Sequence, residues 1–288
     1  MVGNNGKPYA NRAMNESDLL IMVGARVADR AVSQPNLITK NKVLVHIDVD
    51  PAEIGKNAGV SIPIVGDAKS IFKELNSYEA NTSFDEWIEE IEGLKKEFAC
   101  IFDEEGELVP PHSFVSSLSA QMKDDAIYVA DVGQNQIYSC SAYVVKKGKF
   151  LTSGGMGTMG YSIPAAMGAK LATPKKQVVC VCGDGAFQMS MPELATIVSN
   201  QLDVKIFVMN NASLGMIREY QKMYYNKHYT MNELGRIPDI SLISKAYGIH
   251  YYSISEETEC EEIIKQVLEC EQGCICEVFV DKDARCFV

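Results

Sequence analysis

Two short runs of almost wholly apolar residues, Val178–Cys182 and Val204–Met209, each end abruptly at polar or glycine residues. Runs without polar alternation are typical of strands buried on both faces of a parallel sheet. Between them, Ser190-Met191-Pro192-Glu193 has the S-x-x-E form of a capping box, which predicts a helix from here to about Asn200. The pattern therefore predicts a strand, helix, strand crossover whose two strands end at the same edge of the sheet.

The predicted edge carries polar residues that suit a phosphate and a metal ion. Gly183-Asp184-Gly185 follows the first strand, and Asn210-Asn211 follows the second. Ligands of open α/β sheets usually bind at this edge. A carboxylate, an amide oxygen and a backbone carbonyl suit Mg²⁺, and the glycines let a diphosphate approach the backbone. The alternative is that the two segments are simple turns.

Similar apolar runs recur along the chain and predict two domains. Residues 18–24, 43–49 and 61–65 predict three strands of a partial Rossmann-like domain in residues 1–77, with a helix at Lys69–Leu75 and an uncovered edge. Residues 78–107 are acidic, contain one amphipathic helix around Phe84–Phe98, and predict a linker.

The second predicted domain covers residues 108–288 and has α/β class, with a doubly wound parallel sheet. Besides the crossover, its predicted elements are helices His112–Met122, Ile163–Leu171, Asp239–Tyr247 and Glu256–Cys270, and strands Ala126–Ala130, Ile249–Tyr252 and Cys274–Val280.

Composition narrows the class of protein. The 288 residues are 47% hydrophobic and 23% charged, as in ordinary globular proteins. A net charge of −11 argues against a nucleic-acid surface, no apolar run reaches the ~20 residues of a membrane span, and the first residues have no signal-peptide layout. We therefore expect a protein with no nucleic-acid or membrane partner.

The cysteines give a second indication of the compartment. Nine cysteines scattered through predicted core favour reduced thiols and a cytoplasmic location. The pairs Cys180/Cys182 and Cys274/Cys276 have C-x-C spacing, which metal sites also use. Because both pairs fall inside apolar strands, we expect them to pack as small hydrophobic residues.

A family resemblance begins at the predicted diphosphate site. A GDG segment, twenty-four intervening residues and a paired asparagine resemble the signature of thiamine-diphosphate (ThDP) enzymes. The following Ala212-Ser213-Leu214-Gly215-Met216 resembles the NNxxLGM continuation of acetolactate synthases. The resemblance implies Mg²⁺ ligation by Asp184, Asn211 and the backbone carbonyl of Ser213. It also implies that a further set of residues lines the cofactor: Gly183, Gly185, Ala186, Leu214, Gly215 and Met216.

Two more segments extend this resemblance. Asp131-Val132-Gly133-Gln134-Asn135-Gln136 resembles the DVGQHQ stretch of acetolactate synthases, which implies that Val132, Gly133, Gln134 and Asn135 approach the diphosphate. Asn135 stands where the family has histidine, so a donor is kept and a titratable group is lost.

The glycine-rich segment Leu151–Gly160, LTSGGMGTMG, resembles LTSGGLGTMG. By that resemblance the carbonyl of Gly157 accepts from the cofactor's amino group and Met159 wedges between its rings, although core packing is the alternative for this methionine. The segment also satisfies G-x-G-x-x-G, but no acidic residue follows at the spacing that an NAD site requires.

The resemblance also implies a substrate pocket and a possible flavin site. Met216 and Tyr220 would border the second substrate, with Tyr220 in place of the family's tryptophan, and Arg218–Tyr229 would form a helix and loop over the active site. Near the start, Gly24–Arg30 and His46–Ile54 resemble GARFDDR and HIDIDPAEI of the family's central domain. These matches imply that FAD lies along Gly24, Ala25, Arg26, Asp48 and Asp67; turns and helix caps are the alternative.

As a whole the chain resembles the C-terminal half of an acetolactate synthase catalytic subunit. This family condenses pyruvate with pyruvate or 2-oxobutyrate and releases CO₂, in branched-chain amino acid biosynthesis. No segment matches the family's pyrimidine-binding domain, so we expect its catalytic glutamate to come from a longer parent chain or a separate subunit. A homodimer and a regulatory small subunit are further expected assemblies. The alternatives are another ThDP enzyme, of the pyruvate oxidase or 2-oxo acid decarboxylase type, and a non-catalytic cofactor-domain remnant or interaction subunit.

Overall fold

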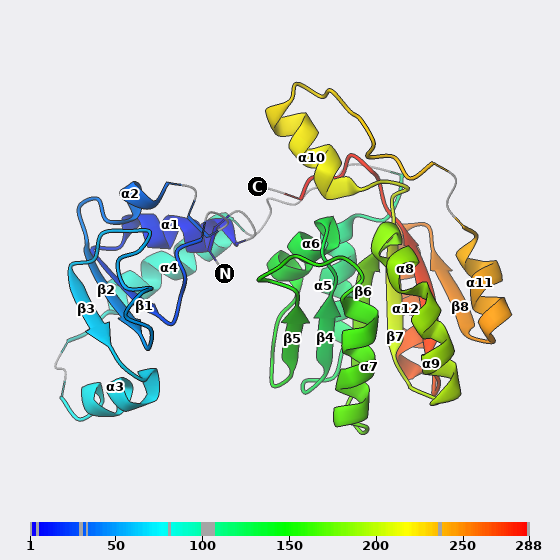
Figure 1. The fold of residues 1–288 in the computed structure, drawn as a ribbon, viewed down its shortest axis with the longest axis horizontal. Helices are drawn as coiled ribbons and strands as arrows, with labels where there is room; N and C mark the ends of the chain where they lie inside the picture. Colours follow the sequence, from blue (N-terminus) through cyan, green and yellow to red (C-terminus); the bar gives the residue numbers. More distant parts are fainter. Residues whose placement is uncertain are drawn as a thin grey trace. The chain divides into compact units, whose positions relative to one another are not determined.

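The computed structural model describes residues 2–3, 6–28, 31–32, 34–79, 82–98, 107–235 and 238–286. The chain divides into two compact units, one reaching to Ile101 and the other covering Phe102–Cys286 (Figure 1). The division falls within the predicted linker, 78–107.

The first unit is built on three parallel strands in the order β1-β2-β3. The three predicted strands are confirmed as β1 (Leu19–Val23), β2 (Val43–Asp48) and β3 (Ile62–Val65). Met22 and Leu44 point to one face and pack with Ile38 in a small core. The helices of this unit are α1 (Pro8–Glu16), α2 (Pro35–Ile38), α3 (Ala68–Leu75) and α4 (Asp85–Glu97). The amphipathic helix expected in the linker is α4, and it packs against α1.

The second unit is a six-stranded, all-parallel sheet in the order β5-β4-β6-β7-β9-β8. Its strands are β4 (Ile127–Ala130), β5 (Lys149–Thr152), β6 (Val178–Gly183), β7 (Lys205–Asn210), β8 (His250–Ile254) and β9 (Cys274–Phe279). Its α-helices are α5 (Pro111–Gln121), α6 (Gln134–Ala142), α7 (Ser162–Ala172), α8 (Asp184–Ser190), α9 (Leu194–Ser199), α10 (Gly215–Tyr224), α11 (Ile240–Tyr247) and α12 (Cys260–Glu269). The predicted α/β class and doubly wound parallel sheet are confirmed.

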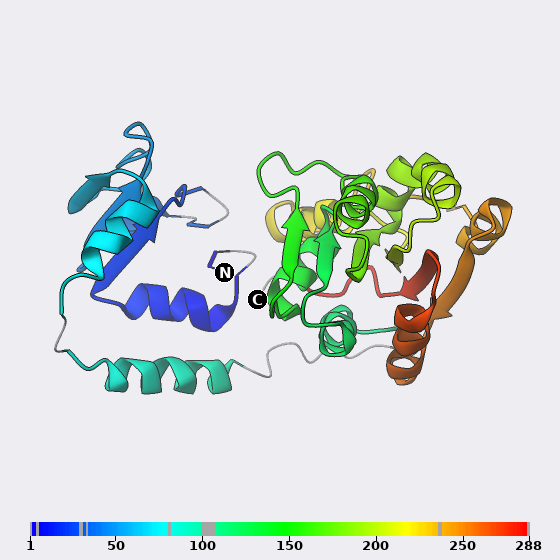
Figure 2. The ribbon, with the colours of Figure 1, turned by 90° about the horizontal axis from the view of Figure 1, so that it is seen from below.

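Helices cover both faces of this sheet. Figures 1 and 2 show α7, α8, α9 and α11 on one face and α5, α6 and α12 on the other. Alternate residues of β6 and β7, among them Cys180 and Ile206, pack with Phe187 and Leu194 beneath the first helix layer. On the opposite face Phe207 packs at 5.5 Å from the ring of Phe114. Because both faces are buried, the central strands carry the uninterrupted apolar runs seen in the sequence.

One sequence prediction in this unit is wrong. Ser190 was expected to cap a helix, but it closes α8, which begins at Asp184 directly after β6. The Ser190 hydroxyl donates to the carbonyl of Gly160 at 2.6 Å, so it ties α8 to the glycine-rich segment. Pro192 then lies in a 3₁₀ turn, Met191–Glu193, that separates α8 from α9.

The paired cysteines lie where the apolar pattern placed them. Cys180 and Cys182 are buried in β6, and Cys274 and Cys276 are buried in β9. Across the described ranges, no group of three or more His, Cys, Asp or Glu side chains is placed to hold a metal ion. In the same ranges no helix has the length and apolar character needed to cross a membrane.

Candidate functional site

The predicted diphosphate and metal residues meet at one edge of the second sheet. Asp131 follows β4, Gly183 and Asp184 end β6 and begin α8, and Asn211 follows β7. The three strands are neighbours and parallel, and Gly183 is in register with Met209. After β4 the chain moves outward to β5, and it then returns to the other side of β4 to form β6. This reversal creates the crevice in which open α/β sheets bind ligands.

Asp184 has the environment of a cation ligand. Its side chain is buried; Oδ1 accepts from the backbone N–H of Gly185 at 2.8 Å, whereas Oδ2 has no hydrogen-bond partner among the described residues. Burial raises the pKa of this carboxyl group to about 6, and the nearby backbone amides of Gly185, Ala212 and Asn211 act in the opposite direction. The carboxylate therefore lies beside the loop that carries the other two predicted ligands. A buried oxygen without a partner fits a site that a divalent cation completes.

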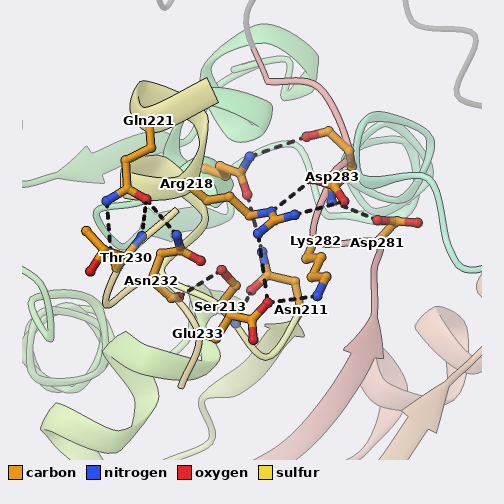
Figure 3. Close-up of polar contacts among 12 residues, drawn as sticks. Asn211, Ser213, Arg218, Gln221, Thr230, Asn232, Glu233, Asp281, Lys282 and Asp283 are labelled. Carbon is orange, nitrogen blue, oxygen red and sulfur yellow. Dashed lines mark hydrogen bonds and ion pairs between the residues drawn. The ribbon is translucent and has the colours of Figure 1, made fainter. Parts of the chain in front are cut away.

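The loop that carries Asn211 and Ser213 is held by an antiparallel contact with residues 232–234. Leu214 N–H donates to the carbonyl of Asn232 at 2.6 Å, and the hydroxyl of Ser213 donates to the same carbonyl at 2.9 Å. Within the loop, Asn211 Oδ1 accepts from Ser213 N–H at 3.0 Å. Figure 3 shows Asn211 and Ser213 beside Asn232 and Glu233. These hydrogen bonds hold Asn211 and Ser213, the two predicted ligands of this loop, in fixed positions relative to each other.

Glycines let the segments approach one another. A Cβ atom on Gly215 would lie 1.8 Å from Gln134 Oε1 and 2.8 Å from Asn211 Nδ2. A Cβ atom on Gly185 would lie 3.1 Å from Leu214 Cδ2 and 3.4 Å from Met159 Cε. Residues predicted from four separate segments to line one cofactor thus lie close together. A Cβ atom at position 215 would therefore displace the carboxamide of Gln134 from its observed position.

Gln134 and Asn135, at the start of α6, have different hydrogen bonds. Gln134 Oε1 accepts from Asn211 Nδ2 at 3.2 Å, which links the predicted diphosphate contact to a predicted metal ligand. Asn135 Nδ2 donates to the carbonyls of Asp131 at 2.9 Å and Val181 at 3.2 Å. Its amide hydrogens are therefore used to join β4 to β6, and this arrangement leaves neither of them for a phosphate group.

The glycine-rich segment is anchored by Asp131, to which the sequence analysis gave no role. Asp131 is fully buried and accepts from Gly160 N–H at 3.0 Å, and from the N–H and hydroxyl of Ser162 at 2.8 and 2.6 Å. Gly160 adopts φ +80°, a conformation that favours glycine. Gly157 adopts φ +69° and is exposed. Asp131 thus fixes one end of the loop whose Gly157 carbonyl was expected to contact the cofactor.

The remaining predicted residues differ in what they can contact. The side chain of Ala186 is buried in the sheet core, so only its backbone can reach a ligand. Met159 packs partly against the same core, as its alternative interpretation expected, and its end lies near Gly185; its contact with the cofactor rings stays a prediction. Val132 is partly exposed next to Asp131. Met216 and Tyr220 are partly exposed one turn apart on α10, in agreement with the helix expected in this region.

The five residues proposed for FAD lie at the carboxyl ends of the strands of the first unit. Gly24 ends β1 at φ +57°, with Ala25 and Arg26 exposed after it, and Asp48 ends β2. Asp67 follows β3 and caps α3, since its side chain accepts from the N–H of Ser70 at 3.0 Å. The helix-cap alternative therefore applies to Asp67. Two residues of the matching segment, 29 and 30, lie outside the described residues.

Two further residues near the site could not be found from sequence. Arg218 of α10 donates from Nε to Asp283 Oδ1 at 2.9 Å and from Nη2 to Asp283 Oδ2 at 3.1 Å. The partners are 65 residues apart, and no periodicity or motif connects them. The pair joins the helix after the metal loop to the segment that follows β9.

Comparisons with known proteins agree with this geometry. Residues 131–278 match the family described as thiamine pyrophosphate enzyme, C-terminal TPP binding domain, and residues 1–75 match the central domain of thiamine pyrophosphate enzymes. The chain is 36% identical to a probable acetolactate synthase large subunit of Methanococcus aeolicus, over 98% of this chain and 50% of the relative.

Two further relatives give the same result. Identity is 35% to the acetolactate synthase large subunit of Cyanidium caldarium, over 100% of this chain and 50% of the relative. Identity is 36% to the acetolactate synthase large subunit of Lactococcus lactis subsp. lactis, over 98% of this chain and 49% of the relative. The chain thus spans about half the length of the curated relatives that it matches.

Proposed function

Because the chain belongs to the thiamine pyrophosphate enzyme family, we propose that it carries the diphosphate- and magnesium-binding half of an acetolactate synthase active site. The observation that carries this proposal is the unpartnered Oδ2 of buried Asp184, beside the Asn211–Ser213 loop at the carboxyl edge of the sheet. The similarity to acetolactate synthase large subunits supports this reaction class over other ThDP enzymes.

The residues have distinct proposed roles. Asp184, Asn211 Oδ1 and the carbonyl of Ser213 would hold Mg²⁺, which in turn would bind the diphosphate. Gln134 would donate an amide hydrogen to the diphosphate, and Gly133 would let the backbone approach it. Asp131 keeps the glycine-rich segment in place, and the Gly157 carbonyl of this segment would accept a hydrogen bond from the amino group of the cofactor.

The reaction proposed is the condensation of two 2-oxo acids. Bound thiamine diphosphate would supply the electron sink for the loss of CO₂ from pyruvate. Met216 and Tyr220 on α10 would border the second 2-oxo acid, pyruvate or 2-oxobutyrate, and exclude water from it. By the same proposal the product would serve branched-chain amino acid biosynthesis, and the protein would be cytoplasmic.

Turnover is proposed to require a pyrimidine-binding domain. None of the residues assigned above is proposed as the activating acid, and the chain spans about half the length of the relatives that it matches. A longer form of this chain or a second chain, within a homodimer or another assembly, would supply the activating acid. A regulatory small subunit is a further proposed partner. Acetolactate formation from pyruvate, ThDP and Mg²⁺ by the purified chain alone would contradict the need for the additional domain.

The test of the central proposal is thermal unfolding with Mg²⁺ and ThDP, added separately and together. Ligand at 100 times its dissociation constant stabilises the native state by about 2.7 kcal/mol, which corresponds to a rise of several degrees. We expect this rise only with both ligands, and we expect Asp184→Asn to remove it. Asp124→Asn is the matched control, because Asp124 precedes β4 at the opposite edge and pairs with Lys146 at 3.3 Å. A native protein whose unfolding temperature does not respond to the two ligands would refute the proposal.

FAD binding by the first unit is a separate and weaker proposal. Gly24, Ala25, Arg26 and Asp48 are exposed or partly exposed at one sheet edge, where a dinucleotide could lie. Asp67 already uses its carboxylate as a helix cap, so it is the least suited of the five. A flavin absorbance band that remains with the protein through gel filtration would support this proposal, and Gly24→Val should remove the band.

A further inference from the structure

The segment Asp281–Cys286, which follows β9, contacts both sides of the proposed diphosphate site. On one side Asp283 accepts two hydrogen bonds from Arg218 of α10, at 2.9 and 3.1 Å (Figure 3). The Arg218 side chain is only 10% exposed, and its guanidinium carbon lies 3.9 Å from the centre of the Tyr229 ring. An arginine held in this way can keep a carboxylate in one orientation, since the two parallel hydrogen bonds fix both groups.

On the other side the same segment contacts α6. The carbonyl of Ala284 accepts from Gln134 Nε2 at 3.3 Å and from the hydroxyl of Tyr138 at 3.1 Å. Cys286 is buried close to the Gln134 carboxamide. Ala284 is the next residue after Asp283, so the ion pair with Arg218 positions the Ala284 carbonyl together with the hydrogen bond from Ala284 N–H to the carbonyl of Asp281 at 3.2 Å.

These contacts form a closed ring around the carboxamide of Gln134. Gln134 Oε1 accepts from Asn211, and a Cβ atom at Gly215, the first residue of α10, would lie 1.8 Å from this oxygen. Arg218 is less than one turn further along α10. It binds Asp283, and the next residue, Ala284, accepts a hydrogen bond from Gln134, which closes the ring. The carboxamide thus contacts Asn211, the first residue of α10 and the segment that α10 holds.

We propose that Arg218 and Asp283 are positioning residues of the diphosphate site: their ion pair latches the segment Asp281–Cys286 and thereby fixes Gln134 and the Asn211–Ser213 loop for ligand binding. The inference rests on the proposed function for the identity of the ligand, but the latch itself belongs to the unliganded protein. A glutamine side chain has many rotamers, so without the latch it would lose more conformational freedom on binding and bind more weakly.

The other charged contacts of the segment are weaker anchors. Lys282 pairs with Glu233 at 3.0 Å, and both side chains are largely exposed, at 45% and 62%. Glu233 also lies 3.9 Å from Arg218. Exposed pairs of this kind contribute little. The bidentate pair with Asp283 is therefore the contact to test.

The first experiment measures amide hydrogen exchange of the full chain without ligand. The variant is Asp283→Asn, which removes the charge at a half-exposed position, and the control is Asp124→Asn, the same change in a surface pair at the opposite edge. We expect Asp283→Asn to speed exchange in peptides covering residues 134–142 and 211–224 and to leave β4 and α7 as in the native protein. Unchanged exchange in both regions would overturn the inference.

The second experiment measures the Mg²⁺-dependent affinity for ThDP by titration calorimetry. We expect Asp283→Asn and Arg218→Lys each to weaken binding by about five- to tenfold, since a lysine cannot make the bidentate pair. The double variant should be no weaker than either single variant, and Asp283→Glu should recover most of the loss. Native affinity in Asp283→Asn despite faster exchange would overturn the positioning role. Failure of the native chain to bind ThDP would instead refute the proposed function, while the exchange experiment would still decide whether the latch exists.

Discussion

Asp184 and Asp131 are both buried aspartates that follow neighbouring parallel strands, yet the structure predicts opposite effects when each is changed to asparagine. Asp131 accepts four hydrogen bonds, from Val132, Gly160 and twice from Ser162. Asp184 accepts one on Oδ1, and its Oδ2 has no hydrogen-bond partner among the described residues. The charge of Asp131 is thus stabilised by donors on both oxygens, whereas the charge of Asp184 has a donor on one oxygen among the described residues.

The cost of the Asp184 charge follows from its pKa. Burial raises the pKa to about 6 in the folded protein, against about 3.9 in an unfolded chain. Between these values the native state holds more protons than the unfolded state, so the free energy of unfolding falls as pH rises. The decrease in the free energy of unfolding is complete above pH about 6. It amounts to about 3 kcal/mol, because each unit of difference in pKa corresponds to about 1.36 kcal/mol.

We therefore expect Asp184→Asn to stabilise the metal-free protein at pH 7, by about 1 to 3 kcal/mol because the new amide also lacks a full set of partners. The gain should vanish near pH 4. Asp131→Asn should destabilise by about 3 kcal/mol, since an amide hydrogen would face the N–H donors that the carboxylate now accepts from.

The assay is urea unfolding in EDTA at both pH values, followed by far-UV circular dichroism. The single tryptophan, Trp87, lies in α4 of the first unit, so its fluorescence follows that unit separately and should not change in either variant. A metal-free Asp184→Asn protein that is less stable than the native one at pH 7, or equally altered at both pH values, would refute the reasoning.

Two other changes test the packing around the site, and a third tests a buried lysine at the opposite end of β7. Gly215→Ala should leave the unfolding free energy within about 1 kcal/mol, because the flexible carboxamide of Gln134 can rotate away, but should remove the thermal response to Mg²⁺ and ThDP. Gly160→Ala should cost about 2 kcal/mol or more in urea unfolding, since φ is +80° and the new Cβ would lie 2.8 Å from Ser190 Oγ; a neutral result would contradict the contact. Lys205→Met should destabilise the protein by about 3 kcal/mol in the same assay, because this buried ammonium group donates to two backbone carbonyls and a carboxylate. An unchanged free energy of unfolding would contradict this reasoning.

The sequence predicted the sheets well because their physics is local to each strand. Apolar runs such as Val178–Cys182 are long enough to form a strand and too apolar to face water, so they identify β6 and β7 without knowledge of the rest of the chain. Helix starts were harder. The pattern at Ser190 satisfied a capping box, but the chain turns into α8 immediately after β6, and Ser190 bonds Gly160 instead.

The sequence predicted only those parts of the candidate site that lie in recognisable motifs. The GDG and NN segments meet because their strands are neighbours in the sheet, which the crossover pattern implied. The ion pair between Arg218 and Asp283 depends on where the chain after β9 returns, and that path is set by tertiary packing. Asp283 lies soon after the end of β9 at Phe279, and nothing in the local sequence identifies Arg218 as its partner.

Asp131 and Asp184 show where sequence reasoning ends. Each follows an apolar strand and precedes a glycine by one or two residues, so pattern alone ranks them equally as ligands. The two aspartates differ in how many hydrogen-bond donors surround their carboxylate oxygens. Asp131 has Gly160 and Ser162 from a distant loop to satisfy both oxygens, whereas Oδ2 of Asp184 has no hydrogen-bond partner among the described residues. A saturated carboxylate fixes a loop and an unsaturated one can bind a cation, so the role of each aspartate is determined by the residues that fold around it.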